Sequence, residues 1–370
     1  MKYLDEFRDG QLAQGLAAHI RQAVAPNRHY ALMEFCGGHT HAICRYGIED
    51  LLPDTIRLIH GPGCPVCVLP SGRLQAAIEL VERERLILCS YGDLLRVPGA
   101  HGDTLLKAKA RGADIRMVYS ISDALEIARA HPERSVVFFA IGFETTTPPT
   151  AVAIRQAQQE GLRNFSVYCN HVLTPPALRA LLAAGGEVDG FIGPAHVSTI
   201  IGSQPYEFVA SDHQRPLVIA GFEPLDMLRA IAMLIRQINA GEAIVENEYT
   251  RAVSAAGNRK AQGLMEEVFR VRPTFEWRGL GWLPDSALAI RPEFAEWDAE
   301  QQFEMPPIQA ADHKACACGE VLRGVKHPQD CTVFGTACTP EHPLGSCMVS
   351  AEGACAAYYH YGRFRQAAAS

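Results

Sequence analysis

The sequence contains no apolar run long enough to cross a membrane. Its longest apolar stretches have the size of a single strand, as at 136–141, or carry charges, as at 225–238, whereas a spanning helix needs about 20 apolar residues. The N-terminal segment MKYLDEFRDG also has no apolar signal core. We therefore expect a cytoplasmic protein that is neither exported nor bound to a membrane.

Positive charge is also scarce. Lys and Arg total 34 against 41 Asp and Glu, which leaves a net charge of −7. Nucleic-acid binding usually requires a basic face, so we expect no nucleic-acid partner. With 48% hydrophobic and 20% charged residues, the composition is that of a globular protein and excludes a disordered or fibrous chain. A chain of 370 residues has room for two to three domains.

Cysteine is abundant and unevenly placed. Six of the 12 cysteines crowd into the C-terminal tail: Cys316, Cys318, Cys331, Cys338, Cys347 and Cys355. A cytosolic chain keeps its thiols reduced, so such a cluster indicates metal or redox chemistry rather than disulfide crosslinks. A chain of this length also builds a core without crosslinks.

Eight short apolar runs have the pattern of buried strands, and each is followed by Gly, Pro or polar residues. The predicted strands are 31–35, 56–60, 86–91, 115–119, 136–141, 165–169, 189–193 and 217–221. Helical periodicity between many of them indicates parallel α/β units. We expect two open sheets, with the first four strands in one and the last four in the other; a closed barrel is the alternative. Helices are predicted within 4–24 and 225–270, and irregular chain over 272–310.

Polar segments follow seven of these strands. They are CGGHTH (36–41), GPGCPVC (61–67), Gly-Asp (92–93), GFETTTPPT (142–150), NHVLTPP (170–176), PAHVS (194–198) and FEP (222–224). Ligands of open parallel sheets bind beyond the carboxyl ends of the strands. We therefore expect a site in the crevice between the two sheets.

Cys64 and Cys67 form the only pair of cysteines separated by two residues. This spacing lets both sulfurs meet on the first turn of a helix, where the helix N-terminus lowers the pKa of a thiol. The pattern favours a redox dithiol. Half of a zinc site and a purely structural pair are the alternatives, and the absence of a second such pair weakens the zinc interpretation.

Cys36 is followed closely by His39 and His41. A soft thiolate with imidazoles suits iron, zinc or copper, and it equally suits a cysteine nucleophile with a histidine base. His171 and His196 also follow strands at the same expected edge. A structural role is the alternative for each of these histidines.

Glu144, Thr145 and Thr146 follow a buried strand and could receive an anion at a helix N-terminus. No Lys stands beside them, which excludes a P-loop, and helix capping by Thr is the alternative. Asp93 is a further candidate, although Gly-Asp is also an ordinary turn.

The cysteines of the tail carry the strongest inorganic signal. Six thiols among Gly and Pro residues can wrap an iron–sulfur cluster held by four thiolates. Structural zinc is the rival, but its paired knuckles are missing. The spacing does not choose four cysteines from six. For Cys44, Cys89 and Cys169, which have no partner pattern, burial as apolar thiols is expected.

These motifs together closely resemble the HypD family of hydrogenase maturation proteins. The resemblance rests on CGGHTH, GPGCPVC, GFETTTPPTA, PAHVS and the tail CACGEVLRG…DCTVFGTACTPEHPLGSCMVSAEGACAAYYHY, in the same order from 36 to about 361. The expected fold class is α/β, with two Rossmann-like parallel-sheet domains and a third, Cys-rich iron–sulfur domain. The expected boundaries are 28–122 and 123–224 for the sheet domains, and 1–27 with 225–370 for the third.

The resemblance implies a scaffold for the Fe(CN)2CO unit of [NiFe]-hydrogenases. Such proteins act with the small chaperone HypC and receive cyanide from HypE, which HypF supplies with carbamoyl groups; the hydrogenase large subunit is an indirect partner. Iron carrying CN and CO is then a transient cargo. The alternative function is a self-standing iron–sulfur disulfide reductase, and whether the protein is itself an enzyme stays open.

The family pattern also implies roles for individual residues. Four tail cysteines would hold a [4Fe-4S] cluster: Cys316, Cys331, Cys338 and Cys355. Cys36 would hold iron jointly with a cysteine of HypC, and His196 would line that iron site. Cys64 and Cys67 would form a redox dithiol linked to the cluster, similar to ferredoxin–thioredoxin reductase. We add His39 and His41 as candidate metal ligands and Asp93 and Glu144 as candidate catalytic residues.

Overall fold

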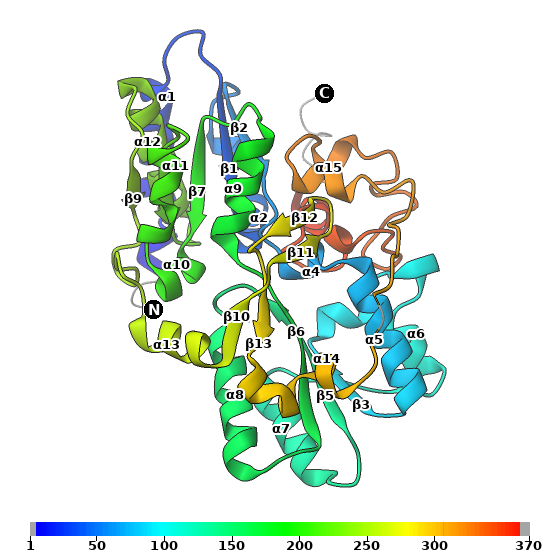
Figure 1. The fold of residues 1–370 in the computed structure, drawn as a ribbon. Coiled ribbons are helices and arrows are strands. Elements are labelled where there is room, and N and C mark those ends of the chain that lie inside the picture. Colours follow the sequence, from blue (N-terminus) through cyan, green and yellow to red (C-terminus); the bar gives the residue numbers. More distant parts are fainter. Residues whose placement is uncertain (1–4, 306, 363–370) are drawn as a thin grey trace.

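The structure is a computed structural model that describes residues 5–305 and 307–362. It is a mixed α/β protein with two parallel sheets and a cysteine-rich region. Figure 1 shows the first sheet at the upper left, the second sheet below it, and the cysteine-rich tail in orange and red at the right. No helix within these ranges is both long and apolar enough to cross a bilayer.

The first sheet has five parallel strands. Their spatial order is β2 (Ile56–His60), β1 (Tyr30–Glu34), β7 (Gly190–Pro194), β8 (Leu217–Ala220) and β9 (Val245–Asn247). The helices that follow or flank these strands are α1 (Gly10–Ala23), α2 (Gly37–Tyr46), α3 (Ile48–Leu51), α10 (Ala195–Ile201), α11 (Glu207–Ser211) and α12 (Pro224–Ala240). Helices α1 and α12 pack against each other, and both contribute to an apolar core with the strands.

The second sheet has four parallel strands. Their order is β4 (Asp114–Met117), β3 (Ile87–Ser90), β5 (Val136–Gly142) and β6 (Phe165–His171). The associated helices are α4 (Pro65–Val68), α5 (Ser71–Glu84), α6 (Leu105–Ala110), α7 (Ile121–Ala130) and α8 (Thr147–Glu160). Helix α9 (Thr174–Ala184) follows β6 but packs against the first sheet, in one core with β1, β7 and β8. Strands β5 and β6 are buried along their whole length, as expected for continuous apolar runs in a covered parallel sheet.

All eight predicted strands are present, but their expected grouping is wrong. Strands β1 and β2 pair with β7 and β8, whereas β3 to β6 form the other sheet. The first sheet thus takes strands from both sides of the boundary expected at 122/123. Buried parallel strands are all apolar, so their composition does not say which of them pair. The short strand β9 was not predicted.

The segment expected to be irregular contains strands. After α13 (Arg259–Val268), β10 (Phe269–Val271) pairs with β13 (Leu288–Ile290), and the hairpin β11 (Thr274–Trp277) and β12 (Gly281–Pro284) lies between them. Helix α14 (Ala299–Gln302) follows, and the tail adds α15 (Cys318–Leu322), α16 (Ala354–Ala357) and a π-helical turn, Tyr358–Gly362. Short strands with Pro and Gly at their ends have too little alternation to stand out in the sequence.

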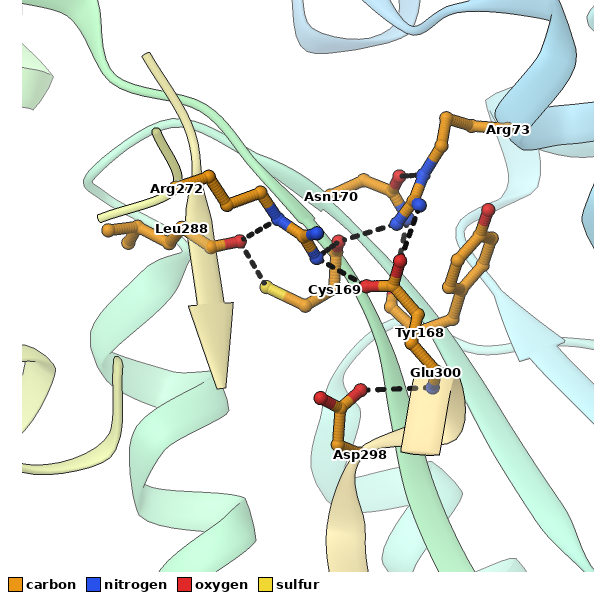
Figure 2. Close-up of polar contacts among 8 residues, drawn as sticks. All are labelled: Arg73, Tyr168, Cys169, Asn170, Arg272, Leu288, Asp298 and Glu300. Atoms are coloured by element: carbon orange, nitrogen blue, oxygen red, sulfur yellow. Dashed lines mark hydrogen bonds and ion pairs between the residues drawn. The ribbon is translucent and has the colours of Figure 1, made fainter. Parts of the chain in front are cut away.

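A half-buried ion-pair network connects this segment to the second sheet. Figure 2 shows Glu300 of α14 between Arg73 of α5 and Arg272. Both guanidinium groups also donate to the carbonyl of Cys169 on β6. The network lies along the edge of β6 that does not pair with β5. There it joins three parts of the chain that are distant in sequence.

Candidate functional site

Cys36 lies where β1 ends and α2 begins. It is the N-cap residue of α2 and is buried. The amide of Gly37 donates a 3.1 Å hydrogen bond to the carbonyl of Gly63. A Cβ atom at Gly63 would come within 2.3 Å of the Cα of Cys36, so only glycine permits this approach. The loops that carry Cys36 and Cys64 are therefore packed backbone to backbone.

The thiol of Cys36 faces His196, the second residue of α10. The Cys36 Sγ and His196 Nδ1 atoms are 3.3 Å apart. Burial raises the pKa of the Cys36 thiol, and the carboxyl groups of Glu352 and Glu34 raise it further. Burial lowers the pKa of His196 to about 4. At neutral pH the pair is thus a thiol beside an uncharged imidazole, and a soft cation could displace the thiol proton and bind both side chains.

The two histidines of α2 contact different neighbours. The Nε2–H of His39 donates to the carbonyl of Ala220 at 3.0 Å, and its Nδ1 has no hydrogen-bond partner within the described structure. Burial lowers the pKa of His39. The Nδ1 of His41 instead lies 3.2 Å from the carbonyl of Ala351 in the tail. His39 thus offers a buried nitrogen lone pair, whereas His41 joins α2 to the tail.

A cleft of about 620 Å³ opens between the two sheets. Its polar lining comes from the loops after β3, β5 and β7 and from the tail: Asp93, Thr145, Thr146, His196, Ser350 and Glu352. The crevice expected at the carboxyl ends of the strands is therefore present. A second pocket of about 380 Å³ contains His41 and shares His196 and Glu352 with the cleft, so these two residues are reached from two openings.

Glu144 is turned away from this lining. Its carboxylate accepts hydrogen bonds from the backbone N–H and the hydroxyl of Thr174, at 2.8 and 2.9 Å, and so anchors the start of α9. Burial raises the pKa of Glu144 to about 7. A catalytic role for Glu144 stays a prediction, and the neighbouring Thr145 and Thr146 are the residues of this motif that reach the cleft. His171 is likewise buried, with its Nε2 2.9 Å from the hydroxyl of Thr150.

Cys64 and Cys67 are joined by a disulfide at the start of α4. Both residues are buried, while Pro65 and Val66 between them line the cleft. The Cys67 amide also donates to the Cys64 sulfur at 3.2 Å. The disulfide therefore lies directly beneath the cleft wall.

The tail forms an apolar pocket that all six of its cysteines line. Cys318 and Cys347 are joined by a disulfide, which the sequence did not reveal. The other four, Cys316, Cys331, Cys338 and Cys355, are not in disulfides. Burial and the neighbouring thiols raise the pKa of Cys355, and burial raises that of Cys316 to about 11. Cys316 and Cys355 therefore hold their protons more tightly than exposed thiols do, and a metal centre bound here would have to displace those protons.

The two disulfides belong to one apolar cluster. It contains Cys64, Cys67, Cys318 and Cys347, and Cys316 and Cys355 pack against it. The hydroxyl of Ser346 donates to the Cys67 carbonyl at 3.0 Å and lies 3.6 Å from the Cys318 sulfur. The two disulfides and two of the free tail thiols, Cys316 and Cys355, therefore lie in one packed apolar region.

Sequence reasoning missed three polar residues of the site. Glu34 and His60 are the last residues of β1 and β2, and Glu352 packs against Gly37. The sequence did contain a signal for Glu34 and His60. Each is a polar side chain in an apolar strand, and such a side chain requires a hydrogen-bond partner when it is buried. Nothing in the sequence around Glu352 marked it.

Fold and site together define a cysteine-rich α/β protein with a thiol–imidazole pair at an inter-sheet cleft and a multi-thiol pocket in its tail. The family model described as HypD, "Hydrogenase formation hypA family", matches residues 11–362. The chain belongs to this HypD family of hydrogenase maturation factors.

Curated relatives match along nearly their whole length. The chain is 63% identical to the hydrogenase expression/formation protein HupD of Azotobacter chroococcum, covering 100% of this chain and 99% of the relative. It is 59% identical to HypD of Cupriavidus necator, with 99% and 98% covered. It is 46% identical to HypD of Escherichia coli, with 98% of each chain covered.

Proposed function

We propose that this chain is the redox-active scaffold on which the Fe(CN)2CO unit of a [NiFe]-hydrogenase is assembled. In this role the chain holds the iron cargo jointly with HypC, receives cyanide from HypE, which depends on HypF, and serves the hydrogenase large subunit indirectly. It works in the cytoplasm as a three-part protein of two parallel-sheet domains and an iron–sulfur tail.

The pairing of Cys36 with His196 is the observation that carries this proposal. A thiol and an uncharged imidazole, 3.3 Å apart and buried beside an open cleft, suit a soft, low-spin ferrous ion with strong-field ligands. The Nδ1 of His39 also has no hydrogen-bond partner in the described part of the chain, but the ligand atoms of Cys36, His39 and His196 do not all lie within 4.8 Å of one another, so the proposed iron site rests on Cys36 and His196. Because two openings reach His196 and Glu352, the partner that shares the iron and the donor of cyanide have separate approaches.

The four tail cysteines outside the disulfide fit a [4Fe-4S] cluster. They line one apolar pocket, yet within the described residues no three of their sulfurs lie within 4.8 Å of one another. A single zinc ion would hold its sulfurs about 3.8 Å apart, since Zn–S bonds are about 2.3 Å, whereas a cluster accepts thiolates on separate irons. Cys316, Cys331, Cys338 and Cys355 would hold the cluster, which when bound supplies single electrons.

The Cys64–Cys67 disulfide fits the two-electron partner of such a site. Opening it consumes two electrons and two protons and yields two thiols. This disulfide, the Cys318–Cys347 disulfide and two of the proposed cluster ligands belong to one apolar cluster, which supports electron transfer between the proposed iron–sulfur cluster and the Cys64–Cys67 pair. We propose that Cys64 and Cys67 cycle between disulfide and dithiol while the iron cargo is modified.

Infrared spectroscopy of the anaerobic complex with HypC tests the proposed iron site. The complex should show C≡N and C≡O stretching bands, and Cys36→Ala should abolish them. Cys89→Ala is the matched control, because Cys89 is an equally buried thiol within β3 of the other sheet. Bands that persist in Cys36→Ala would exclude Cys36 as the iron ligand, and a wild-type complex without bands would overturn the scaffold proposal.

A self-standing disulfide reductase is the second candidate. The position of Pro65 and Val66 in the cleft wall favours it, since a substrate disulfide could approach there. It assigns no role to the Cys36–His196 pair. Turnover of a small disulfide substrate by the isolated chain, undiminished in Cys36→Ala, would favour this second function.

A further inference from the structure

Glu34 is a buried carboxylate that holds the backbone of Cys36. It is fully buried at the end of β1, and its Oε2 accepts a 2.7 Å hydrogen bond from the Cys36 amide. Its Oε1 accepts from the Thr40 hydroxyl and lies 2.8 Å from the Nδ1 of His60. No Arg or Lys forms an ion pair with Glu34 in the part of the chain that the structure describes. His60 is therefore the ring that orients this carboxylate, through its contact with Oε1.

The chain of hydrogen bonds continues from His60 into the tail. The Nε2 of His60 lies 2.9 Å from the hydroxyl of Tyr358, and that hydroxyl donates to Glu49 at 2.6 Å. Tyr358 is buried and stands three residues after Cys355. An unbroken series of contacts thus runs from the cysteine-rich tail, through two strand ends of the first sheet, to the amide of Cys36.

A bound metal ion is an alternative explanation for the polar residues around His60. Potential ligand atoms of Glu49, His60 and His327 all lie within 4.8 Å of one another. The Tyr358 hydroxyl, however, already contacts both Glu49 and His60, and the second ring nitrogen of His60 is bonded to Glu34. The phenol therefore satisfies these groups where an ion would otherwise sit, and the geometry favours a hydrogen-bonded connection.

We propose that His60 and Tyr358 are positioning residues, which fix the Cys36 loop through Glu34 and so let the tail set the reactivity of the Cys36 thiol. A buried carboxylate that loses one of its donors reorients or draws in water, and the Cys36 amide is bonded to that carboxylate. The tail also braces the same loop through the His41–Ala351 contact. This deepens the proposed function, because it makes the proposed cluster region and the proposed iron thiol structurally dependent on each other.

Two isosteric variants test the connection in the full-length chain. Tyr358→Phe and Thr40→Val each remove one hydroxyl of the series, and the rate of alkylation of Cys36 by iodoacetamide is measured by peptide mass spectrometry. We expect both variants to accelerate alkylation about fivefold, the equivalent of one hydrogen bond, because a loosened loop exposes the thiol. Thr40→Ser keeps a hydroxyl and should restore the wild-type rate.

The matched control is Tyr30→Phe. The hydroxyl of Tyr30 bonds Asn239 and the Ala25 amide at the opposite end of β1, so its loss should leave the Cys36 rate within twofold of wild type. An unchanged rate in Tyr358→Phe and Thr40→Val, or an equal rise in Tyr30→Phe or Thr40→Ser, would overturn the proposal. The wild type is purified without added iron or HypC, so that Cys36 carries no cargo. A rise in its rate on treatment with a zinc chelator, matching that of Tyr358→Phe, would overturn the proposal in favour of an ion at Glu49, His60 and His327. Because alkylation needs no iron or cyanide, its outcome is separate from that of the infrared test.

Discussion

The hydroxyl of Ser346 donates a 3.0 Å hydrogen bond to the backbone carbonyl of Cys67. This contact joins the segment before Cys347 to the turn that carries the Cys64–Cys67 disulfide. Ser346 is completely buried, so water does not replace the bond when the hydroxyl is removed. The tail is therefore held against α4, next to the two disulfides.

Ser346→Ala should destabilise the protein by about 1–3 kcal/mol, because it leaves a buried carbonyl without a donor. Urea unfolding at neutral pH measures the effect. Ser211→Ala is the control, since Ser211 is exposed and its hydroxyl donates to the neighbouring Asp212; it should change the free energy of unfolding by less than about 0.5 kcal/mol. Equal effects of the two substitutions would contradict a bridging role for Ser346.

Glu300 is the central acceptor of the network in Figure 2. Burial alone would raise the pKa of Glu300, but Arg73 and Arg272 outweigh it and hold the pKa at about 2. Glu300→Gln should therefore cost about 3 kcal/mol at pH 7, since it leaves two guanidinium groups without their carboxylate. A folded-state pKa below the unfolded value also means that this stability is present above about pH 4.5 and is lost as the pH falls toward 2.

Unfolding measured across this pH range in both proteins tests the assignment. The wild-type advantage over Glu300→Gln should shrink steadily below pH 4.5. An advantage that stays constant down to pH 3 would show that the ion pairs are not its source.

The pKa of Asp298 is shifted in the opposite direction from that of Glu300. Burial raises its pKa to about 6, and the neighbouring Glu300 adds to the rise. A carboxyl whose folded pKa exceeds its unfolded pKa lowers stability at neutral pH. This cost shrinks as the pH falls below about 6 and is gone only below the unfolded pKa of about 4. Asp298→Asn keeps an oxygen to accept from the Glu300 amide and removes the buried charge, so it should stabilise the protein by up to about 2 kcal/mol at pH 7.

Thermal unfolding of Asp298→Asn and wild type at pH 7 and pH 5 measures this effect. The melting temperature of the variant should be higher at pH 7, and the difference should narrow at pH 5. A lower melting temperature at pH 7 would mean that the Asp298 charge itself stabilises the start of α14.

The strands were predictable, because each is a buried apolar run ended by Gly, Pro or polar residues. Their partners were not: after β2 the chain leaves for the second sheet and returns only at β7, and no local pattern records such a return. The cleft followed from the carboxyl ends of the strands, a rule that holds for either grouping.

Within the site, the sequence could predict only those contacts that join residues close together in the chain. The spacing of Cys64 and Cys67 indicated a redox pair from neighbours in one helical turn. The Cys318–Cys347 disulfide closes across 29 positions, and spacing alone cannot select such a pair among six similar cysteines. Glu34 and His60 interact across strands β1 and β2, and only the fold reveals that the two side chains meet.

Replacement of single tail cysteines would identify the proposed cluster ligands. Each of Cys316, Cys331, Cys338 and Cys355, changed to Ser in turn, should lower the iron content and the brown absorption of anaerobically purified protein from about four irons per chain. Cys318→Ser and Cys347→Ser are the controls: they share the same pocket but belong to the disulfide, and they should retain the iron. Loss of iron in these two variants alone would move the cluster onto the disulfide pair, and stoichiometric zinc in place of iron in wild type would exclude the cluster altogether.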